Sequence, residues 1–96
     1  MTNYEKGANA EREAKKLLEM LGYDVIRSAG SKGMWDLVAC YRTHIRLVQV
    51  KVEGAMTPVE YEAIKEYQAS DFCTKEVWTR LPNKPTDERW LVEVVK

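Results

Sequence analysis

Residues 35–52 read WDLVACYRTHIRLVQVKV. Two apolar runs flank a polar turn at 42–44, a pattern that predicts two antiparallel strands joined as a hairpin. Side chains alternate between the two faces of a strand, so Gln49 and Lys51 project together from the second strand, beside the strand that carries Asp36. The stretch therefore predicts a sheet that holds an acid, an amide and a lysine at nearly one point.

The rest of the chain predicts further elements around this hairpin. Apolar periodicity and turn residues predict one long helix before it, and a helix and two strands after it. The order α-β-β-β-α-β-β predicts a single α/β domain over residues 1–96, with a central mixed sheet of about five strands flanked by two helices. The predicted elements are a helix ending at Gly22, strands at 23–28, 35–41 and 45–52, a helix beginning at 57–58, and strands at 76–80 and 89–94.

Both predicted helices have clear limits. In the first, apolar residues recur at three- and four-residue spacing, and Gly22 follows as a stop signal. Glu11 lies nearer to the centre of the apolar stripe than any other charged residue, so it is either a site carboxylate or an ordinary edge glutamate. In the second, Thr57 and Glu60 form a capping box, with Pro58 in the first turn. The stripe of the first helix consists of Ala10, Ala14, Leu17, Leu18 and Leu21.

Length and composition exclude several classes of protein. A chain of 96 residues with 45% hydrophobic and 31% charged residues suits one globular domain with one core. No apolar run approaches the length of a membrane span, and the first residues lack the apolar stretch of a signal peptide, so we expect a cytoplasmic protein without a membrane partner. Two cysteines and one histidine make neither a disulfide framework nor a zinc cluster, and they remove most Ser/His and Cys/His nucleophile mechanisms.

Charge is unevenly distributed, although the net charge is zero. From residue 27 to residue 51 the only acid is Asp36, whereas the segment that follows is acidic. Positive charge around the hairpin predicts contact with phosphates, and a solvated surface is the plainer alternative. The loop at 29–33 has two glycines and a serine whose backbone N–H groups suit an anion, or it simply connects two strands. The basic residues concerned are Arg27, Lys32, Arg42, Arg46 and Lys51.

Lys51 needs a partner, because it lies among apolar neighbours and burying an unpaired charge is costly. That partner is either a phosphate, a metal-bound water or the Asp36 carboxylate. The last alternative is a plain salt bridge on a half-exposed sheet face, without any chemistry. The residues alone leave these alternatives open.

Three short segments resemble one family of nucleases. They are Asn9-Ala10-Glu11-Arg12-Glu13, the stretch from Ser28 through Asp36-Leu37-Val38-Ala39, and Val48-Gln49-Val50-Lys51. In this order and spacing they resemble the archaeal-type Holliday junction resolvases, together with their compact phage relatives and the VRR-NUC nucleases of the PD-(D/E)xK superfamily. The resemblance covers roughly the first two-thirds of the chain and implies a restriction-endonuclease-like fold.

The resemblance implies a role for each matching residue. Asp36 would be the central ligand of Mg²⁺ or Mn²⁺, with Glu11, Gln49 and the Val50 backbone carbonyl as further ligands. Lys51 would orient or activate the attacking water during phosphodiester hydrolysis and offset charge on the scissile phosphate. The substrate would be branched DNA, above all a four-way junction, which a symmetric homodimer would cut in both strands. Contacts to the DNA backbone are expected from Ser28, Ser31, Lys32, Arg27 and Arg46.

Two positions depart from the family pattern. Gln49 stands where the family usually has an acid, so an uncharged oxygen would bind the metal and metal affinity should fall. Trp35 stands where a proline is common. Gln49 and the zero net charge favour one alternative, a catalytically silent DNA-binding module. The others are a phage or mobile-element nuclease that acts on flap, nicked or linear DNA in a host cytoplasm, and an unrelated α/β domain with an Asp–Lys pair.

Overall fold

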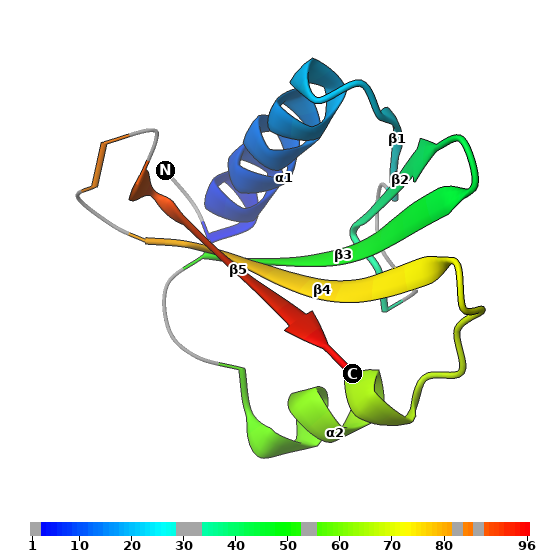
Figure 1. Ribbon diagram of the computed structural model, residues 1–96. Coiled ribbons are helices and arrows are strands. Elements are labelled where there is room, and N and C mark those ends of the chain that lie inside the picture. Colours follow the sequence, from blue (N-terminus) through cyan, green and yellow to red (C-terminus); the bar gives the residue numbers. More distant parts are fainter. Residues whose placement is uncertain (1–2, 29–33, 53–55, 82–83, 86–87) are drawn as a thin grey trace.

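The computed structural model describes residues 3–28, 34–52, 56–81, 84–85 and 88–96. These described residues form two helices and five strands in the predicted order (Figure 1). The elements are α1 (Asn3–Met20), β1 (Asp24–Arg27), β2 (Leu37–Tyr41), β3 (His44–Val52), α2 (Pro58–Glu66), β4 (Cys73–Arg80) and β5 (Trp90–Val95).

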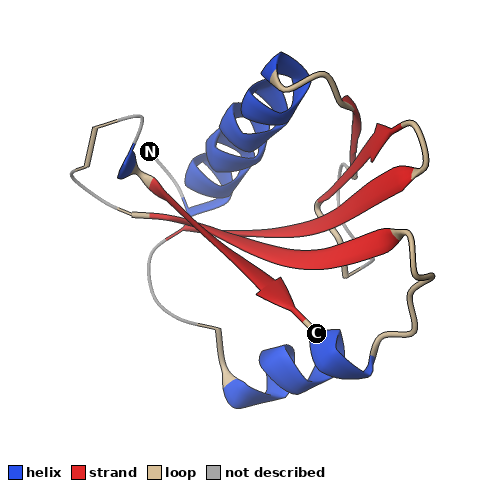
Figure 2. Ribbon diagram, in the orientation of Figure 1, coloured by secondary structure: helices blue, strands red, loops and turns tan. Residues whose placement is uncertain are grey.

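The strands make one sheet in the order β1-β2-β3-β4-β5. Neighbouring strands are antiparallel except β3 and β4, which are parallel. Parallel neighbours need a crossover connection, and α2 lies in the connection between β3 and β4. Figure 2 shows α1 and α2 on opposite sides of the sheet. The predicted mixed sheet with two flanking helices is therefore confirmed.

The hairpin of β2 and β3 is uneven, and this shapes the site described below. Tyr41 pairs with His44 across the turn, and the last pair at the other end joins Leu37 and Val48. Residues 49–52 of β3 therefore extend past β2, while on its other side β3 stays paired with β4 to its end. One edge of the overhanging part of β3 is left open to side chains from neighbouring segments.

Two strands begin at other residues than predicted. β2 begins at Leu37 instead of residue 35, because its regular pairing with β3 ends there, so Asp36 stands just before the strand that was predicted to carry it.

The start of β4 differs for another reason. β4 begins at Cys73, three residues before the predicted start at 76. Its first residues are polar, but they find partners inside the protein. The Thr74 hydroxyl donates to Glu76 at 2.6 Å, and the Lys75 ammonium donates to the Tyr67 carbonyl after α2 at 3.1 Å. The polar residues did not predict a strand here. Their contacts with other parts of the protein offset the cost of placing them in one.

The end of α1 follows the predicted glycine stop. Gly22 has a φ of 97°, which suits a residue without Cβ, and its N–H donates to the Glu19 carbonyl at 3.0 Å. The Tyr23 N–H donates to the Leu18 carbonyl at 3.1 Å, which completes a Schellman motif. Leu21, which the sequence analysis placed in the apolar stripe, is 64% exposed because it lies beyond the last helical residue.

The start of α2 is the predicted capping box. The Thr57 hydroxyl accepts the Glu60 N–H, the Glu60 carboxylate accepts the Thr57 N–H, and Pro58 is the first helical residue. This prediction is confirmed. None of the described helices is both long enough and apolar enough to cross a membrane.

The core has two parts, one on each face of the sheet. Alternating side chains of the same strands contribute to both, so β3 sends Val48 towards α1 and Leu47 towards α2. The part below α1 contains Ala14, Leu18, Leu37, Ala39, Val48 and Trp78. The part above α2 contains Trp35, Leu47, Ile64, Val77 and Val95.

Candidate functional site

Asp36 meets the polar residues of the hairpin at the open end of β3. It stands one residue before β2, and its backbone N–H donates to the Val48 carbonyl at 2.9 Å. Its carboxylate Oδ2 accepts the Val50 N–H at 2.7 Å, so the side chain takes the place of a missing strand neighbour. Asp36 thus contacts Val48 and Val50, the two residues that flank Gln49 in β3. The acid and the amide therefore belong to one site.

The Val50 carbonyl faces the same space as the Asp36 carboxylate. A residue in a β-strand points its N–H and C=O groups to the same edge. Because the Val50 N–H reaches Asp36, the carbonyl of Val50 also faces the edge of β3 that β2 leaves open. A main-chain oxygen and a carboxylate thus border one gap at the end of the sheet.

Gln49 presents a buried oxygen that has no hydrogen-bond partner among the described residues. An unsatisfied buried acceptor costs about 1–3 kcal/mol, so a ligand for this oxygen would remove that cost. The Trp35 indole Nε1 is buried and unpartnered in the same sense. The end of β3 thus has polar groups left over, beside a carboxylate.

Glu11 reaches the site from α1 but is already engaged. Its Oε1 accepts the Arg27 Nε–H at 2.9 Å, and both side chains are about one-fifth exposed, at 19% and 21%. The Glu11 carboxylate also lies close enough to Asp36 for the Asp36 charge to raise the pKa of Glu11. Glu11 is therefore a neighbour of Asp36, and Arg27 is the group that it holds directly.

Lys51 pairs with Glu60 of α2, a contact that the sequence analysis did not predict. The alternative of a direct ion pair between Asp36 and Lys51 is wrong, although the lysine is near enough to lower the pKa of Asp36. The hydrogen bond from Lys51, together with those from Thr57, lowers the pKa of Glu60 to about 2. The sequence identified Glu60 only as a member of the capping box. That role accounts for a glutamate at this position, so nothing in the sequence pointed to its contact with Lys51.

The five charged side chains alternate in sign across the end of the sheet, and we call them the charged row: Glu11, Arg27, Asp36, Lys51 and Glu60. Burial raises the pKa of Asp36, although the Val50 N–H, Lys51 and Arg27 act in the opposite direction. Burial and the Asp36 charge raise the pKa of Glu11 against the effect of Arg27. At both carboxylates burial therefore outweighs the effect of the nearby positive charges on the pKa.

The oxygen atoms at this point fit a hard divalent cation. Mg²⁺ and Mn²⁺ prefer carboxylate, amide and carbonyl oxygens, and Asp36, Gln49 and Val50 supply one of each. Among the described residues, no three His, Cys, Asp or Glu side chains cluster as a metal site. A cation would therefore depend on the amide and the main chain as well as on Asp36, with Glu11 nearby.

Some of the residues predicted to contact DNA lie within the described part of the chain. Arg27 lies in the charged row, and Ser28 follows it, half-buried, with its N–H donating to the Asp36 carbonyl at 2.9 Å. Ser31 and Lys32 lie at 29–33, outside the described residues. Ser28 is thus at the border of the site, where a phosphate contact stays a prediction.

Arg46 lies away from the charged row, in a buried cluster. Its guanidinium donates to both Glu76 carboxylate oxygens, from Nε to Oε1 and Oε2 and from Nη2 to Oε1, at 2.8–3.1 Å, and it lies over the rings of Tyr23 and Trp78. Glu76 also accepts hydrogen bonds from Thr74 and Trp78. Arg46, Glu76, Thr74 and Trp78 are the Glu76 cluster, and the engagement of the Arg46 guanidinium with the buried Glu76 carboxylate does not favour its predicted DNA contact.

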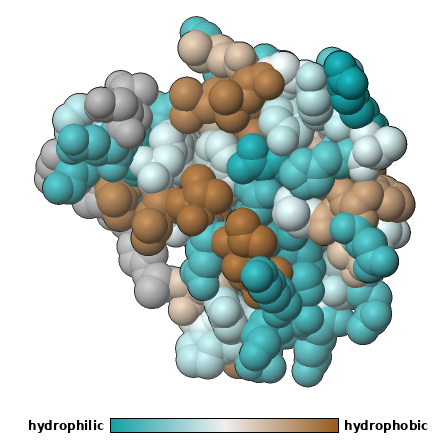
Figure 3. All heavy atoms as spheres, viewed as in Figure 1, coloured by the Kyte–Doolittle hydropathy of each residue, from teal (hydrophilic) through white to brown (hydrophobic). Residues whose placement is uncertain are grey.

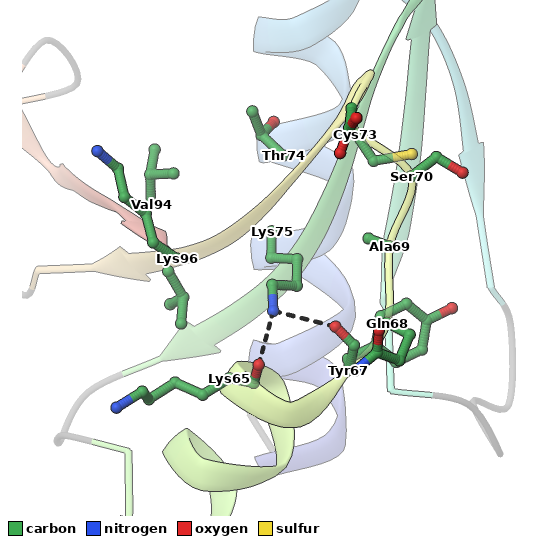
Figure 4. A pocket seen from close by; sticks show the side chains of 12 residues that line it. Lys65, Tyr67, Gln68, Ala69, Ser70, Cys73, Thr74, Lys75, Val94 and Lys96 are labelled. Carbon is green, nitrogen blue, oxygen red and sulfur yellow. Dashed lines mark hydrogen bonds between the residues drawn. The ribbon is translucent and has the colours of Figure 1, made fainter.

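A cavity of about 470 Å³ lies at the other end of β4, between the α2–β4 connection and the end of β5 (Figure 4). None of the predicted site residues lines it. Lys75 donates there to the carbonyls of Ile64, Lys65 and Tyr67 at 2.8–3.1 Å, as a cap for the end of α2. The cavity is therefore part of the helix terminus and is separate from the charged row.

Fold and site together define the class of protein. A mixed sheet with Asp36 before one strand and Lys51 near the end of the next places this chain in the PD-(D/E)xK nuclease superfamily. Residues 2–69 match the profile of the family described as archaeal Holliday junction resolvase (Hjc), and the chain belongs to that family. The resemblance of its sequence motifs is thereby confirmed.

Two relatives illustrate the match. The crossover junction endodeoxyribonuclease Hjc of Methanocaldococcus jannaschii is 50% identical over 51 residues, which cover 53% of this chain and 38% of that protein. The solved structure of Archaeoglobus fulgidus Hjc, a Holliday junction resolvase from an archaeal hyperthermophile, aligns with a TM-score of 0.71 and 22% identity. That alignment covers 93% of this chain and 72% of the other, and it supports the fold alone.

Proposed function

We propose that this protein is a divalent-metal-dependent endonuclease that cleaves four-way DNA junctions. The observation that carries the proposal is the meeting of Asp36, the unpartnered Gln49 oxygen and Lys51 at the open end of β3, in a chain of the resolvase family. The reaction is hydrolysis of a phosphodiester bond, in which water attacks phosphorus and one sugar oxygen leaves.

Each residue of the site has a separate task in this proposal. Asp36, Gln49 and the Val50 carbonyl would hold the cation, and Glu11 would assist directly or through water. Mg²⁺ or Mn²⁺ in this place would stabilise the charge that builds up on the scissile phosphate. Lys51 orients the attacking water and adds a second positive charge next to the phosphate.

DNA approaches the same end of the sheet in this proposal. Arg27 and Ser28 border the charged row, and the predicted contacts Ser31 and Lys32 follow in the next loop of the sequence. Arg27 is suited to a phosphate because its guanidinium has more donors than its contact with Glu11 uses. Arg46 is left out of this set, since Glu76 occupies its guanidinium.

We propose that the protein acts as a homodimer joined along β5. Cutting two strands of a junction needs two sites, and an antiparallel pair of identical edge strands has the required twofold symmetry. Within the described residues β5 is an edge strand, and Figure 3 shows apolar side chains along the region where it crosses the molecule. The edge strand β1 is shorter and carries Arg27, which we assign to DNA. The exposed apolar residues of β5 are Leu91, Val92 and Val94.

Sedimentation of Val92→Lys at micromolar concentration tests the dimer. We expect wild type at dimer mass and the variant at monomer mass, because a buried lysine at the joint has no partner. Val59→Lys is the control, since Val59 is 80% exposed on α2 and its replacement should leave the mass unchanged. Wild type at monomer mass would contradict coordinated cutting, and a dimeric Val92→Lys would contradict the β5 joint.

Cleavage of a labelled four-way junction tests the activity. Flap, nicked, linear and single-stranded DNA serve as controls, each with Mg²⁺, Mn²⁺ or EDTA. We expect paired symmetric nicks in the junction with either metal, and none with EDTA or with Asp36→Ala. Cleavage of the control substrates in place of the junction would retain the nuclease and replace its substrate by that of the phage-type alternative.

One observation favours a second candidate, a DNA-binding module without catalysis. Among the described residues, no three His, Cys, Asp or Glu side chains form a group that could hold a metal ion. Gln49 stands where the family usually has an acid. Such a module would bind the junction and cleave no substrate with either metal. Junction binding that is the same in wild type and Asp36→Ala, without cleavage, would support it.

A further inference from the structure

Glu60 divides its two carboxylate oxygens between a helix cap and Lys51. Its Oε1 accepts the Thr57 N–H at 3.0 Å, and its Oε2 accepts the Lys51 ammonium. The Thr57 hydroxyl accepts the Glu60 N–H at 3.2 Å and caps the helix, whereas the Thr57 backbone N–H is the group that fixes the Glu60 carboxylate. The first turn of α2 therefore presents a fixed negative oxygen to the lysine at the end of β3.

Lys51 depends on such a partner for its position. A lysine carries its charge on a flexible four-carbon stem, and neither Lys51 nor Glu60 is fully buried, at 25% and 34% exposure of the side chain. The other acid nearby, Asp36, acts on Lys51 through its charge without a direct contact. Of the two acids, only Glu60 holds the ammonium by a hydrogen bond.

We propose that Glu60 is a positioning residue for Lys51 in the proposed cleavage reaction. This inference rests on the proposed function, because it concerns how Lys51 is aimed at the substrate. The Glu60 oxygen limits the directions that the ammonium can take, while the lysine keeps further N–H groups for water or phosphate. Glu60 touches neither substrate nor cation and acts through Lys51.

The chemistry of the contact explains why this position carries glutamate. A capping box accepts either glutamate or glutamine at its third position. Here both oxygens have a donor, Thr57 on one side and Lys51 on the other. The amide of Glu60→Gln has one oxygen and one NH₂ group, so it faces a donor with a donor at one of the two contacts.

Cleavage by three variants under single-turnover conditions tests the inference, with enzyme in excess over a four-way junction. We expect Glu60→Gln to cut at least about tenfold more slowly than wild type, because a small misplacement of a reacting group is costly. Junction affinity without divalent metal should change by less than about twofold, since Glu60 does not touch DNA. Glu60→Asp keeps the charge on a shorter stem and should cut at an intermediate rate.

Thr57→Ala is the matched control for the helix cap. It removes the hydroxyl that accepts the Glu60 N–H and leaves the Glu60–Lys51 contact in place. Its thermal midpoint should fall as far as that of Glu60→Gln, while its cleavage rate stays within about twofold of wild type. A structural role for Glu60 would slow both variants equally, and that result would overturn the inference.

A double variant shows whether Glu60 acts through Lys51. In the presence of Lys51→Met, the further change Glu60→Gln should leave the residual cleavage rate unchanged, because the group that it positions is gone. Equal slowing in both backgrounds, or a Glu60→Gln rate equal to wild type, overturns the inference while the nuclease stands. Wild type that cuts no DNA at all overturns the proposed function, and the inference with it.

Discussion

The charged row and the Glu76 cluster both contain ionisable side chains at β3. They differ in how many hydrogen-bond partners their carboxylates have. Glu76 accepts hydrogen bonds from Arg46, Thr74 and Trp78, which lower its pKa although burial alone would raise it. Asp36 accepts one backbone hydrogen bond, and burial raises its pKa. The Glu76 carboxylate is satisfied by its neighbours, whereas beside Asp36 the buried Gln49 oxygen has no hydrogen-bond partner among the described residues. Incomplete satisfaction thus marks the region that we assign to chemistry.

The largest expected effect concerns Asp36→Asn. Junction cleavage should fall about a thousandfold or more, since several kcal/mol of charge stabilisation are lost. The free energy of unfolding at neutral pH should stay equal or rise, because the variant removes a charge that burial disfavours. Cleavage assays and urea unfolding measure the two quantities. Asp24→Asn, at an exposed acid of β1, is the control, and an Asp36→Asn protein as unstable as it is inactive would contradict the comparison.

Glu76→Ala should reduce the stability of the protein, in contrast to Asp36→Asn. It leaves the Arg46 guanidinium buried without its partner, so we expect a loss of about 3–5 kcal/mol in unfolding free energy. Urea unfolding followed by tryptophan fluorescence measures this loss. The double variant Arg46→Met/Glu76→Leu should lose less than Glu76→Ala, because no unpaired charge remains. A loss under about 1 kcal/mol for Glu76→Ala would mean that the cluster is not what stabilises this part of the sheet.

Gln49→Glu should have a smaller effect on cleavage than Asp36→Asn. A third carboxylate beside Asp36 and Glu11 adds a charged ligand, so cleavage at low Mg²⁺ should be retained or rise by up to about tenfold. Without metal the variant should be less stable than wild type, since like charges repel. A magnesium titration of the cleavage rate measures the first effect and thermal unfolding the second. Complete loss of cleavage would overturn Gln49 as a metal ligand.

The smallest expected difference between the two regions is in how the stability of the protein depends on pH. The pKa of Glu76 is lowered below 4.5, so its contribution is full above that pH and is lost as pH falls through its pKa in the folded protein. The pKa of Asp36 is raised above 3.8, so protonation on acidification relieves a cost in the folded protein.

Thermal midpoints from about pH 3 to about pH 7 measure both effects. Glu76→Gln should flatten the loss of stability on the acid side, because the titrating group is gone. Asp36→Asn should make that loss steeper, because the compensating protonation is gone. The same slope in both variants and in wild type would mean that neither carboxylate differs between the folded and unfolded protein.

The order of elements could be predicted because it depends on local signals. Alternation over residues 35–52 predicted the hairpin, Gly22 predicted the end of α1, and Thr57 and Glu60 predicted the start of α2. Leu21 was assigned to the apolar stripe although α1 ends at Met20. The early start of β4 was missed because its polar first residues depend on neighbours outside the strand. Local patterns carry no information on such neighbours.

By itself, the sequence determined the strands, the two helix boundaries and the residues Asp36, Gln49 and Lys51 as one group, because each follows from spacing along a few residues. Only the tertiary structure decided the partners: Glu60 for Lys51 and Glu76 for Arg46. The physical reason is that an ion pair depends on which side chains come within hydrogen-bond distance. Packing of α2 and β4 against β3 sets that distance, and spacing in the sequence does not.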